Sequence, residues 1–301
     1  MEKRMLFIVN PCAGLKKVEG YLSRILQVFC RNGWIPTVLM TEYAGHAREL
    51  AQKYAAGFDM VVCAGGDGTL NEVISGLLAA KLDVPIGYLP CGTTNDFAST
   101  LGLSRNLVTA AEDVMTGAPR QVDVGAFNGR SFIYTASFGA FTKSSYETPQ
   151  GVKNVLGHLA YVLSGIKELG QIKPTFARIK TEKGEYSGDY LFGSVSNTTS
   201  LAGVLTIDEE IVKLDDGEFE LLLVDMPTDI ISLNLLLMNL AQKKFGEMLH
   251  LCSAREITIE TYEDVDWTLD GELETGRRKF EIVNMPRAVR IIAPARNENL
   301  T

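Results

Sequence analysis

The first part of the chain alternates between short apolar runs and segments whose apolar residues recur at helical spacing. The runs have the length of strands, and the intervening segments repeat about every three to four residues, as one face of a helix does. Strands that alternate with helices form right-handed βαβ units, so we predict a mainly parallel α/β domain over residues 1–125. The predicted strands are Met5–Val9, Ile35–Met40, Met60–Ala64 and Pro85–Leu89, and the predicted helices cover Tyr21–Phe29, Ala47–Ala56 and Leu70–Leu78.

After Asp123 the pattern becomes one of strands separated by turn signals such as Lys183-Gly184. We therefore predict a second, β-rich domain over residues 126–287, built mainly as an antiparallel sandwich. A last strand, Ala288–Ile292, can pair in either domain, so residues 288–301 can return to the first. The predicted strands of the second domain are Ser131–Phe138, Thr175–Lys180, Tyr190–Ser196, Phe219–Val224, Glu256–Thr261 and Trp267–Leu269, with helices at Val152–Leu169 and Asp229–Phe245.

Composition narrows the classes of function. The formal net charge of −8 and the isoelectric point near 5.1 argue against a nucleic-acid binder, which needs a basic face. The five cysteines include no C-x-x-C pair and indicate reduced thiols rather than disulfides or a zinc site. The longest apolar stretch, Ile230–Ala241, is too short to span a bilayer. Since no signal-peptide pattern opens the chain, we expect a cytoplasmic protein whose membrane contact is transient, local and mostly apolar.

Three polar or glycine-rich loops follow predicted parallel strands, namely Asn10–Gly14, Gly65–Glu72 and Gly92–Phe97. Because ligands bind an open α/β sheet at the carboxyl ends of its strands, these loops predict a cleft at one edge. The glycines of Gly65–Thr69 let the backbone approach phosphate oxygens, and the next helix offers free N–H groups to an anion. Asp67 is placed to hold a magnesium ion through water molecules.

Each of these signals also has a plain structural explanation. The glycine loop has neither the Gly-Lys-Ser/Thr of a Walker A loop nor a dinucleotide-binding glycine pattern, and it can be an ordinary strand–turn–helix corner. Thr94 or Asn95 can cap a helix, Asp215–Gly217 can form a β-turn, and Asp270–Glu272 can form a tight turn. The three histidines match no metal or nucleophile spacing, and the sequence contains no G-x-S-x-G elbow to support a hydrolase.

Four motifs resemble the diacylglycerol-kinase-type family of lipid kinases, in particular its bacterial soluble members, over essentially the whole chain. They are NP-x-AG at 10–14, GGDGT-x-NE at 65–72, P-x-GT-x-NDFA at 90–98 and DGE at 270–272. The resemblance implies a three-layer α/β domain of the GGDG-kinase type that binds ATP, a β-rich domain for the lipid substrate, and catalysis in a cleft between them. The implied ATP-binding residues are Asn10, Pro11, Cys12, Ala13, Gly14, Thr41, Gly66, Asp67, Gly68, Thr69, Leu70, Asn71, Glu72 and Thr93.

The resemblance also assigns roles in the second domain. It implies a magnesium ion held by the carboxylate of Asp216 and by the backbone carbonyls of Lys213 and Glu218, an oxygen set that suits a hard cation. It makes Glu272 the general base, which we expect to be buried, while Asp67 acts near the phosphates. The implied reaction is transfer of the γ-phosphoryl group of Mg-ATP to a lipid hydroxyl at a membrane surface.

The sequence leaves the acceptor open. A diacylglycerol-like lipid is the favoured acceptor, and phosphatidylglycerol and sphingoid bases are the other lipids to consider. A kinase for a soluble acceptor, such as a sugar phosphate or NAD, is an alternative because those enzymes share the GGDG turn. A catalytically silent nucleotide-binding regulator is the alternative from another class.

Overall fold

The computed structural model describes residues 2–14, 18–92, 95–139, 173–198, 200–201, 205–206 and 212–294. The chain divides into two compact units. Unit 1 is Met1–Val122 with Arg287–Thr301, and unit 2 is Asp123–Pro286. The chain passes from one unit to the other inside β5 (Ala118–Phe127) and returns inside β15 (Glu272–Ala293).

Unit 1 is built on a parallel sheet. Its elements are β1 (Lys3–Val9), α1 (Leu22–Arg31), β2 (Trp34–Met40), α2 (His46–Tyr54), the 3-10 helix η1 (Ala55–Gly57), β3 (Met60–Gly65), α3 (Asp67–Ala79), β4 (Ile86–Pro90), α4 (Asp96–Thr100) and α5 (Leu107–Thr116). β1 pairs in parallel with β2 and β3, and β3 pairs in parallel with β4. The returning end of β15 adds a parallel strand beside β4, through Ile291 and Ile86.

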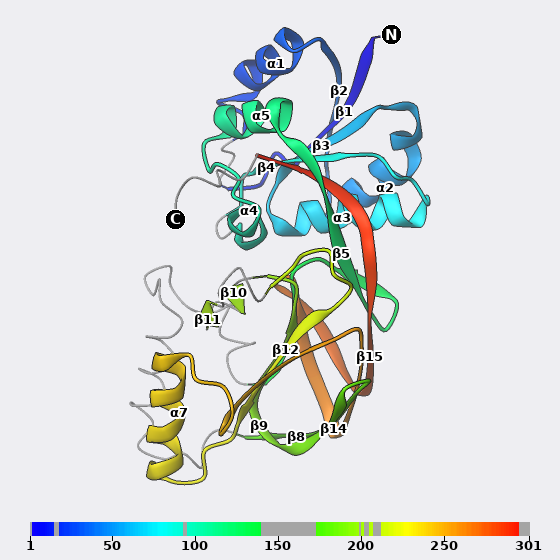
Figure 1. Cartoon of the computed structure of the whole chain (residues 1–301). Coiled ribbons are helices and arrows are strands. Elements are labelled where there is room, and N and C mark those ends of the chain that lie inside the picture. The colour runs from blue at the N-terminus through cyan, green and yellow to red at the C-terminus, as the bar shows by residue number, and fades with distance from the viewer. Residues whose placement is uncertain are drawn as a thin grey trace. The chain divides into compact units, whose positions relative to one another are not determined.

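Helices lie on both faces of this sheet, with α1 and α5 together on one face and α2 and α3 together on the other (Figure 1). The edge of the Phe29 ring on α1 meets Phe7 of β1, with ring centroids 5.4 Å apart. On the opposite face, a Cβ added to Gly76 of α3 would lie 2.4 Å from the carbonyl oxygen of Arg48 on α2. The close approach of α2 and α3 therefore requires glycine at that position.

Unit 2 is mainly antiparallel. Its elements after β5 are β6 (Arg130–Phe132), β7 (Thr135–Gly139), β8 (Thr175–Thr181), β9 (Gly184–Ser196), β10 (Ser200–Leu201), β11 (Leu205–Thr206), β12 (Phe219–Asp225), α7 (Ile230–Gln242), β13 (Leu249–Ala254) and β14 (Glu256–Leu269). The long strands β9 and β14 each pair with β8 over one half and with β7 over the other. The predicted sandwich is thus one hydrogen-bonded sheet in the described part of unit 2, with β10 and β11 forming a separate ladder.

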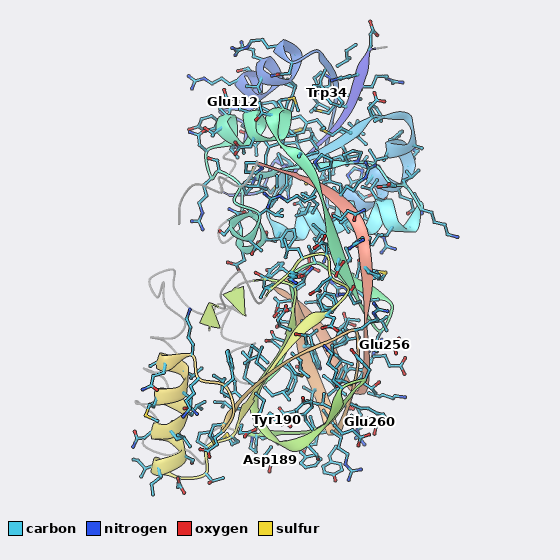
Figure 2. The ribbon with its side chains drawn as sticks, viewed as in Figure 1. Trp34, Glu112, Asp189, Tyr190, Glu256 and Glu260 are labelled. Carbon is cyan, nitrogen blue, oxygen red and sulfur yellow. The ribbon has the colours of Figure 1, made fainter. Side chains whose placement is uncertain are left out.

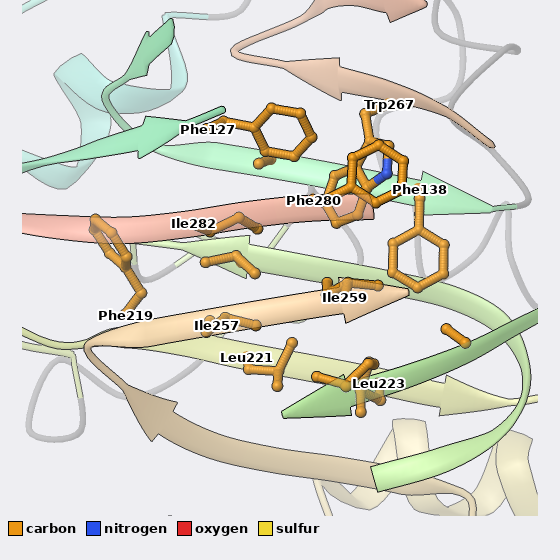
Figure 3. Packing of buried hydrophobic residues seen from close by; sticks show 14 of the residues in the cluster. Phe127, Phe138, Phe219, Leu221, Leu223, Ile257, Ile259, Trp267, Phe280 and Ile282 are labelled. Carbon is orange, nitrogen blue, oxygen red and sulfur yellow. The ribbon is translucent and has the colours of Figure 1, made fainter. Parts of the chain in front are cut away.

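An aromatic cluster fills the core of unit 2 (Figure 3). The indole ring of Trp267 lies 4.9 Å from the ring of Phe127, 4.8 Å from Phe138 and 5.1 Å from Phe280, measured between centroids. These residues come from four different strands, so the cluster holds the curled sheet together. Tyr190, labelled in the lower part of Figure 2, is 3% exposed and belongs to the same cluster.

Several predicted elements differ from the structure. β5 and β13 were not predicted, and the charged segment after Glu272, for which no element was predicted, belongs to the long strand β15. The predicted helix Val152–Leu169 lies outside the described residues. The other predicted helix of unit 2 is α7, which begins at a capping box formed by Asp229 and Ser232. No helix among the residues that the structure describes is long and apolar enough to cross a membrane.

Candidate active site

Loops at the carboxyl ends of β1, β2 and β3 are joined by hydrogen bonds. The backbone N–H of Asn10 donates to the carbonyl oxygen of Ala64 (2.9 Å), and its side-chain amide donates to the hydroxyl of Thr69 (3.0 Å). The backbone N–H of Thr41 donates to the carbonyl oxygen of Val9 (2.9 Å). The sheet therefore brings three of the predicted nucleotide-binding segments together, as the sequence predicted.

The loop after β4 lies against the same group of loops, because the backbone at Gly92 passes close to the backbone at Gly66. A Cβ added to Gly92 would lie 2.8 Å from the Cα of Gly66 and 2.7 Å from the side-chain oxygen of Asn95. The N–H of Cys91 also donates to the carbonyl oxygen of Gly65 (2.7 Å). Only a residue without a side chain fits at position 92, and the two glycine-bearing loops form one surface.

Helix α3 begins at Asp67, so Gly68 lies in its first turn and not in the turn predicted before the helix. Gly66 is at the N-cap position in an extended conformation and provides no side-chain cap. The N–H groups of Asp67, Gly68 and Thr69 therefore stand outside the intrahelical hydrogen bonds, at the positive end of the helix dipole. This arrangement is suited to binding a phosphate.

Asp67 is held inside the cluster by groups from two other elements. One carboxylate oxygen accepts from the Tyr88 hydroxyl (3.3 Å), and the other accepts from the backbone N–H of Asp96 at the start of α4 (3.0 Å). The Asp67 side chain is mostly buried, with an exposed fraction of 7%. Burial, followed by the nearby charge of Asp96, raises the pKa of Asp67 to about 6.

Asn95 does not cap α4 through its side chain, contrary to one of the predicted alternatives. It adopts a left-handed conformation with φ of +51°, and its amide donates to the carbonyl oxygen of Gly92 (2.8 Å). The α4 N-terminus is capped by the carboxylate of Asp67, 29 residues earlier in the chain. Asp96, whose pKa is raised by burial, is a carboxylate of this cluster that the sequence analysis did not single out.

Two of the predicted nucleotide-binding residues, Glu72 and Leu70, use their side chains for contacts within the protein. Both carboxylate oxygens of Glu72 accept backbone N–H groups, from Gly45 (2.7 Å) and from Ala47 (3.0 Å), at the N-terminus of α2. Glu72 thus fixes the loop that follows Thr41. The side chain of Leu70 is fully buried in the core, which leaves only its backbone available to a ligand.

The remaining predicted residues of unit 1 lie in the same loops. The N–H of Cys12 donates to the side-chain oxygen of Asn10 (3.0 Å), and Gly14 has a φ of +56°, so the segment Asn10–Gly14 is a compact turn. The side-chain oxygen of Asn71 accepts from the Ser75 hydroxyl (3.2 Å). Thr93 lies outside the described residues, and Pro11 and Ala13 are half-buried beside Asn10.

In unit 2, the loop proposed to bind magnesium has the hydrogen bonds of a turn. The exposed Asp216 accepts the N–H of Glu218 (3.0 Å), and Gly217 has a φ of +84°. The Glu218 carboxylate pairs with Lys183 (2.6 Å), and the family resemblance assigns only the backbone carbonyl of Glu218 to a metal. The exposed Lys213 begins the loop.

A fully buried carboxylate, which the sequence analysis missed, holds this loop in place. Asp123 accepts the N–H of Gly217 (2.7 Å) and the side-chain amide of Asn284 (3.3 Å). Its backbone N–H donates to the carbonyl oxygen of Leu214 (2.7 Å). The signal that could have found it is a lone charge between Val122 and Val124, because a buried carboxylate needs partners.

Asp270 and Gly271 form a tight turn, as predicted. Their φ values of +47° and +86° match a two-residue hairpin of type I′ between β14 and β15. The Asp270 carboxylate accepts three backbone N–H groups, from Ile133 (2.7 Å), Tyr134 (3.0 Å) and Thr135 (3.0 Å). Asp270 therefore organises the start of β7.

Glu272 follows this turn, and the expectation that it is buried is wrong. Its side chain is 55% exposed, and its carboxylate accepts from Arg130 at 2.5 Å. Arg130 also pairs with Glu274 at 2.7 Å. The type I′ turn starts β15 at Glu272, and this position on the sheet edge leaves the carboxylate facing solvent.

The fold is that of an α/β protein with a cluster of glycine-bearing loops at one edge of its parallel sheet, and comparison with known proteins identifies its family. The family model for the diacylglycerol kinase catalytic domain matches residues 4–127. Diacylglycerol kinase from Bacillus subtilis (strain 168) is 32% identical over 296 residues, which cover 97% of each chain. Diacylglycerol kinase from Staphylococcus saprophyticus is 32% identical over 300 residues, which cover 98% of this chain and 96% of the other.

Comparison with solved structures supports the same family. A crystal structure of a candidate diacylglycerol kinase from Bacillus anthracis str. Sterne is similar with a TM-score of 0.79 at 26% identity, covering 97% of this chain and 95% of the other. The chain therefore belongs to the diacylglycerol kinase family. It is a lipid kinase, a phosphotransferase with an alcohol group as acceptor.

Proposed function

We propose that this lipid kinase transfers the γ-phosphoryl group of ATP to the hydroxyl of a diacylglycerol-like lipid. Unit 1 would serve as the nucleotide-binding domain and unit 2 as the lipid-substrate domain. The observation that supports this best is the group of loops joined at the carboxyl edge of the unit 1 sheet, where free N–H groups of α3 meet Gly92. Phosphoryl transfer depends mainly on positioning and charge neutralisation, which such a group provides.

ATP would be held by backbone groups more than by side chains. The first-turn N–H groups of Asp67, Gly68 and Thr69 would face phosphate oxygens. Asn10–Gly14, Thr41 and the residue at position 93 would complete the site, as the family resemblance implies. Glu72 would act by positioning the loop after Thr41, since its carboxylate is occupied by backbone donors.

The carboxylates of Asp67 and Asp96 fit a magnesium ion that accompanies the nucleotide. Burial raises the pKa of both side chains, and the charge of Asp96 raises that of Asp67 further. Two partly buried carboxylates that repel each other are stabilised by a divalent cation, which would also neutralise phosphate charge. Asp67 would contribute through waters, because its two oxygens already accept hydrogen bonds.

A second magnesium ion would have a structural role in unit 2. Its ligands would be the carboxylate of Asp216 and the backbone carbonyls of Lys213 and Glu218, on the loop that Asp123 anchors. Asp216 is exposed, and one of its carboxylate oxygens, Oδ1, accepts from the N–H of Glu218. Oxygen ligands of this kind suit magnesium.

Glu272 would be the general base. Its carboxylate would take the proton of the lipid hydroxyl as that oxygen forms its bond to the γ-phosphorus and the bond to ADP breaks. The ion pair with Arg130 is at the surface, where such a pair contributes about 0–1 kcal/mol, so Glu272 can leave it for a substrate.

Turnover of labelled ATP over a lipid panel tests the function. The panel contains vesicles with diacylglycerol, phosphatidylglycerol or a sphingoid base, and vesicles without any acceptor, each with and without magnesium. We expect labelled lipid only with diacylglycerol and only with magnesium. Labelling of a soluble acceptor, or ATP consumption that does not depend on lipid, would contradict the proposal.

A further inference from the structure

Buried polar side chains cross one face of the unit 2 sheet. The strand register places Glu220 of β12 opposite Ser196 of β9, and Ser196 opposite Thr135 of β7. Residues that pair directly, and residues two positions apart on one strand, point to the same face of a sheet. The set defined by this register, called the polar patch below, consists of Thr135, Ser137, Ser194, Ser196, Glu220 and Thr268.

Most of the polar patch has no hydrogen-bond partner among the described residues. The unpartnered atoms are the hydroxyls of Thr135, Ser194, Ser196 and Thr268 and the Oε2 atom of Glu220. Glu220 is 2% exposed, and Ser194 and Ser196 are fully buried. Because folded proteins pair nearly all buried polar groups, a concentration of unpaired ones on one face indicates a surface made for a polar ligand.

The chemistry of the polar patch favours an uncharged ligand. Its unpartnered atoms are one carboxyl oxygen and four hydroxyls, and a hydroxyl both donates and accepts hydrogen bonds. No basic side chain belongs to the patch to neutralise a phosphate, and the acidic residues Asp216 and Glu218 shortly precede Glu220 in the chain.

The position of the polar patch connects it to the proposed base. The backbone N–H of Asp270 donates to the carbonyl oxygen of Thr135 (2.8 Å), at one end of the patch. Glu272 follows two residues later across the type I′ turn. On the same face of β12, Leu222 and Val224 continue beyond Glu220 into an apolar cluster. One sheet face thus changes from polar to apolar, as a glyceride does along its length.

We propose that the polar patch binds the uncharged glycerol ester head of the acceptor lipid and that Glu220 is its hydrogen-bonding anchor. This inference rests on the proposed function, in which unit 2 carries the lipid site. Glu220 would be a specificity-determining residue that selects a neutral glyceride over an anionic phospholipid.

The test measures binding of dioctanoylglycerol to the full-length protein without nucleotide by calorimetry, and phosphoryl transfer separately. Glu220→Leu removes the hydrogen-bonding group, whereas Glu220→Gln keeps a hydrogen-bonding side chain of the same size. The matched control is Glu260→Leu, the same change at an exposed position of β14 (Figure 2). We expect Glu220→Leu to weaken binding by roughly 10- to 100-fold, Glu220→Gln to recover most of it, and Glu260→Leu to bind as the wild type does.

Each outcome separates this inference from the proposed function. If Glu220→Leu melts at a higher temperature but binds dioctanoylglycerol like the wild type, the patch holds only ordered water and the inference is overturned. If the wild type does not bind dioctanoylglycerol, the inference is also overturned. If the wild type binds dioctanoylglycerol through Glu220 but transfers no phosphoryl group to it, lipid binding at the polar patch is supported and the proposed function is contradicted.

Discussion

The two carboxylates proposed for catalysis are held in opposite ways. Asp67 is buried and fixed by the Tyr88 hydroxyl and by the backbone of α4, so its geometry is set by the core of unit 1. Glu272 is on the surface, where its ion-pair partner, Arg130, is itself 40% exposed. Asp67 is therefore suited to organising the phosphate loops, and Glu272 to moving toward a substrate.

Glu272→Gln is expected to lower kcat by about 10²–10⁴-fold, because glutamine keeps the size of the side chain but cannot accept the proton. This corresponds to roughly 3–5 kcal/mol of activation free energy. ATP affinity should barely change, because the loops proposed to bind ATP are in unit 1. Steady-state kinetics and nucleotide binding measure both effects.

The matched control is Glu274→Gln, which changes the other partner of Arg130 in the same way. It should retain turnover. Asp270→Asn should instead lower the melting temperature, since it disturbs the acceptor of three backbone N–H groups, at a cost of about 1–3 kcal/mol. Near-normal turnover in Glu272→Gln would assign the base to another group.

Asp67→Asn should abolish turnover and also change how stability depends on pH. The pKa of Asp67 is about 6 in the folded protein, above its ordinary value of 3.8, so the folded state binds the proton more tightly. Ionisation of Asp67 therefore destabilises the wild type progressively between about pH 4 and pH 6, by an amount on the order of 3 kcal/mol. Asparagine removes this penalty.

The measurement is the melting temperature of both proteins without magnesium between pH 4 and pH 7. The difference, variant minus wild type, should increase with pH and level off above pH 6. A constant difference would show that Asp67 does not titrate in this range, and wild-type turnover in the variant would remove Asp67 from the mechanism.

At the scale of elements, the loop before β12 is fixed by one buried side chain. Asp123, in β5, binds the loop at Gly217 and at Leu214. Since β5 also carries the chain from unit 1 into unit 2, the loop is anchored to the connection between the units. A metal bound there would stabilise unit 2 and not take part in the reaction.

Chelation should lower the melting temperature of the nucleotide-free protein if this loop binds magnesium, because a cation that binds the native state stabilises it by mass action. Asp216→Ala should show the lower melting temperature already and respond little to the chelator. Asp215→Ala, the same change one residue earlier, is the control and should respond like the wild type. If chelator changes neither protein, the loop is a plain turn that loses only the Asp216–Glu218 hydrogen bond.

On the scale of the whole molecule, the enzyme has to reach a lipid without a membrane-spanning helix in its described part. Helix α7 offers an apolar surface for this purpose. Leu233, Leu236 and Leu240 belong to the core, whereas Ile230 and Ile231 at its start are 71% and 76% exposed. The exposed Ile230 and Ile231 are therefore the residues of α7 that we expect to dock on a membrane.

A double variant, Ile230→Ser with Ile231→Ser, should weaken partitioning onto diacylglycerol vesicles by about 100-fold or more, because two isoleucines buried in lipid together contribute about 3–6 kcal/mol. Binding of the wild type should change little with salt, since the protein carries a net charge of −8 and docks by apolar contact. The control is Ile35→Ser, at a 47% exposed position of β2. Vesicle binding that disappears at moderate salt would contradict apolar docking.

Local information in the sequence determined the parallel part of unit 1. Apolar runs of strand length and helical spacing place β1 to β4 and α1 to α3 close to their observed bounds, because both periods are set by the backbone. The position of the loops proposed to bind phosphate follows, since parallel strands end at the same edge. The turn at Asp270–Gly271 was also predictable, because few residues adopt two successive positive φ values.

Only the tertiary structure decided what the carboxylates do. Asp67 caps α4 at Asp96, 29 residues later in the chain, and Asp123 binds its loop at Gly217, 94 residues later. A pattern among neighbouring residues cannot show contacts between residues so far apart in the sequence. The polar and charged character of β15 concealed a strand, and its start at a surface turn determined that Glu272 is exposed and paired with Arg130. The polar patch depends on strand register across β7, β9, β12 and β14, which is fixed by long-range pairing and not by the order of residues along any one strand.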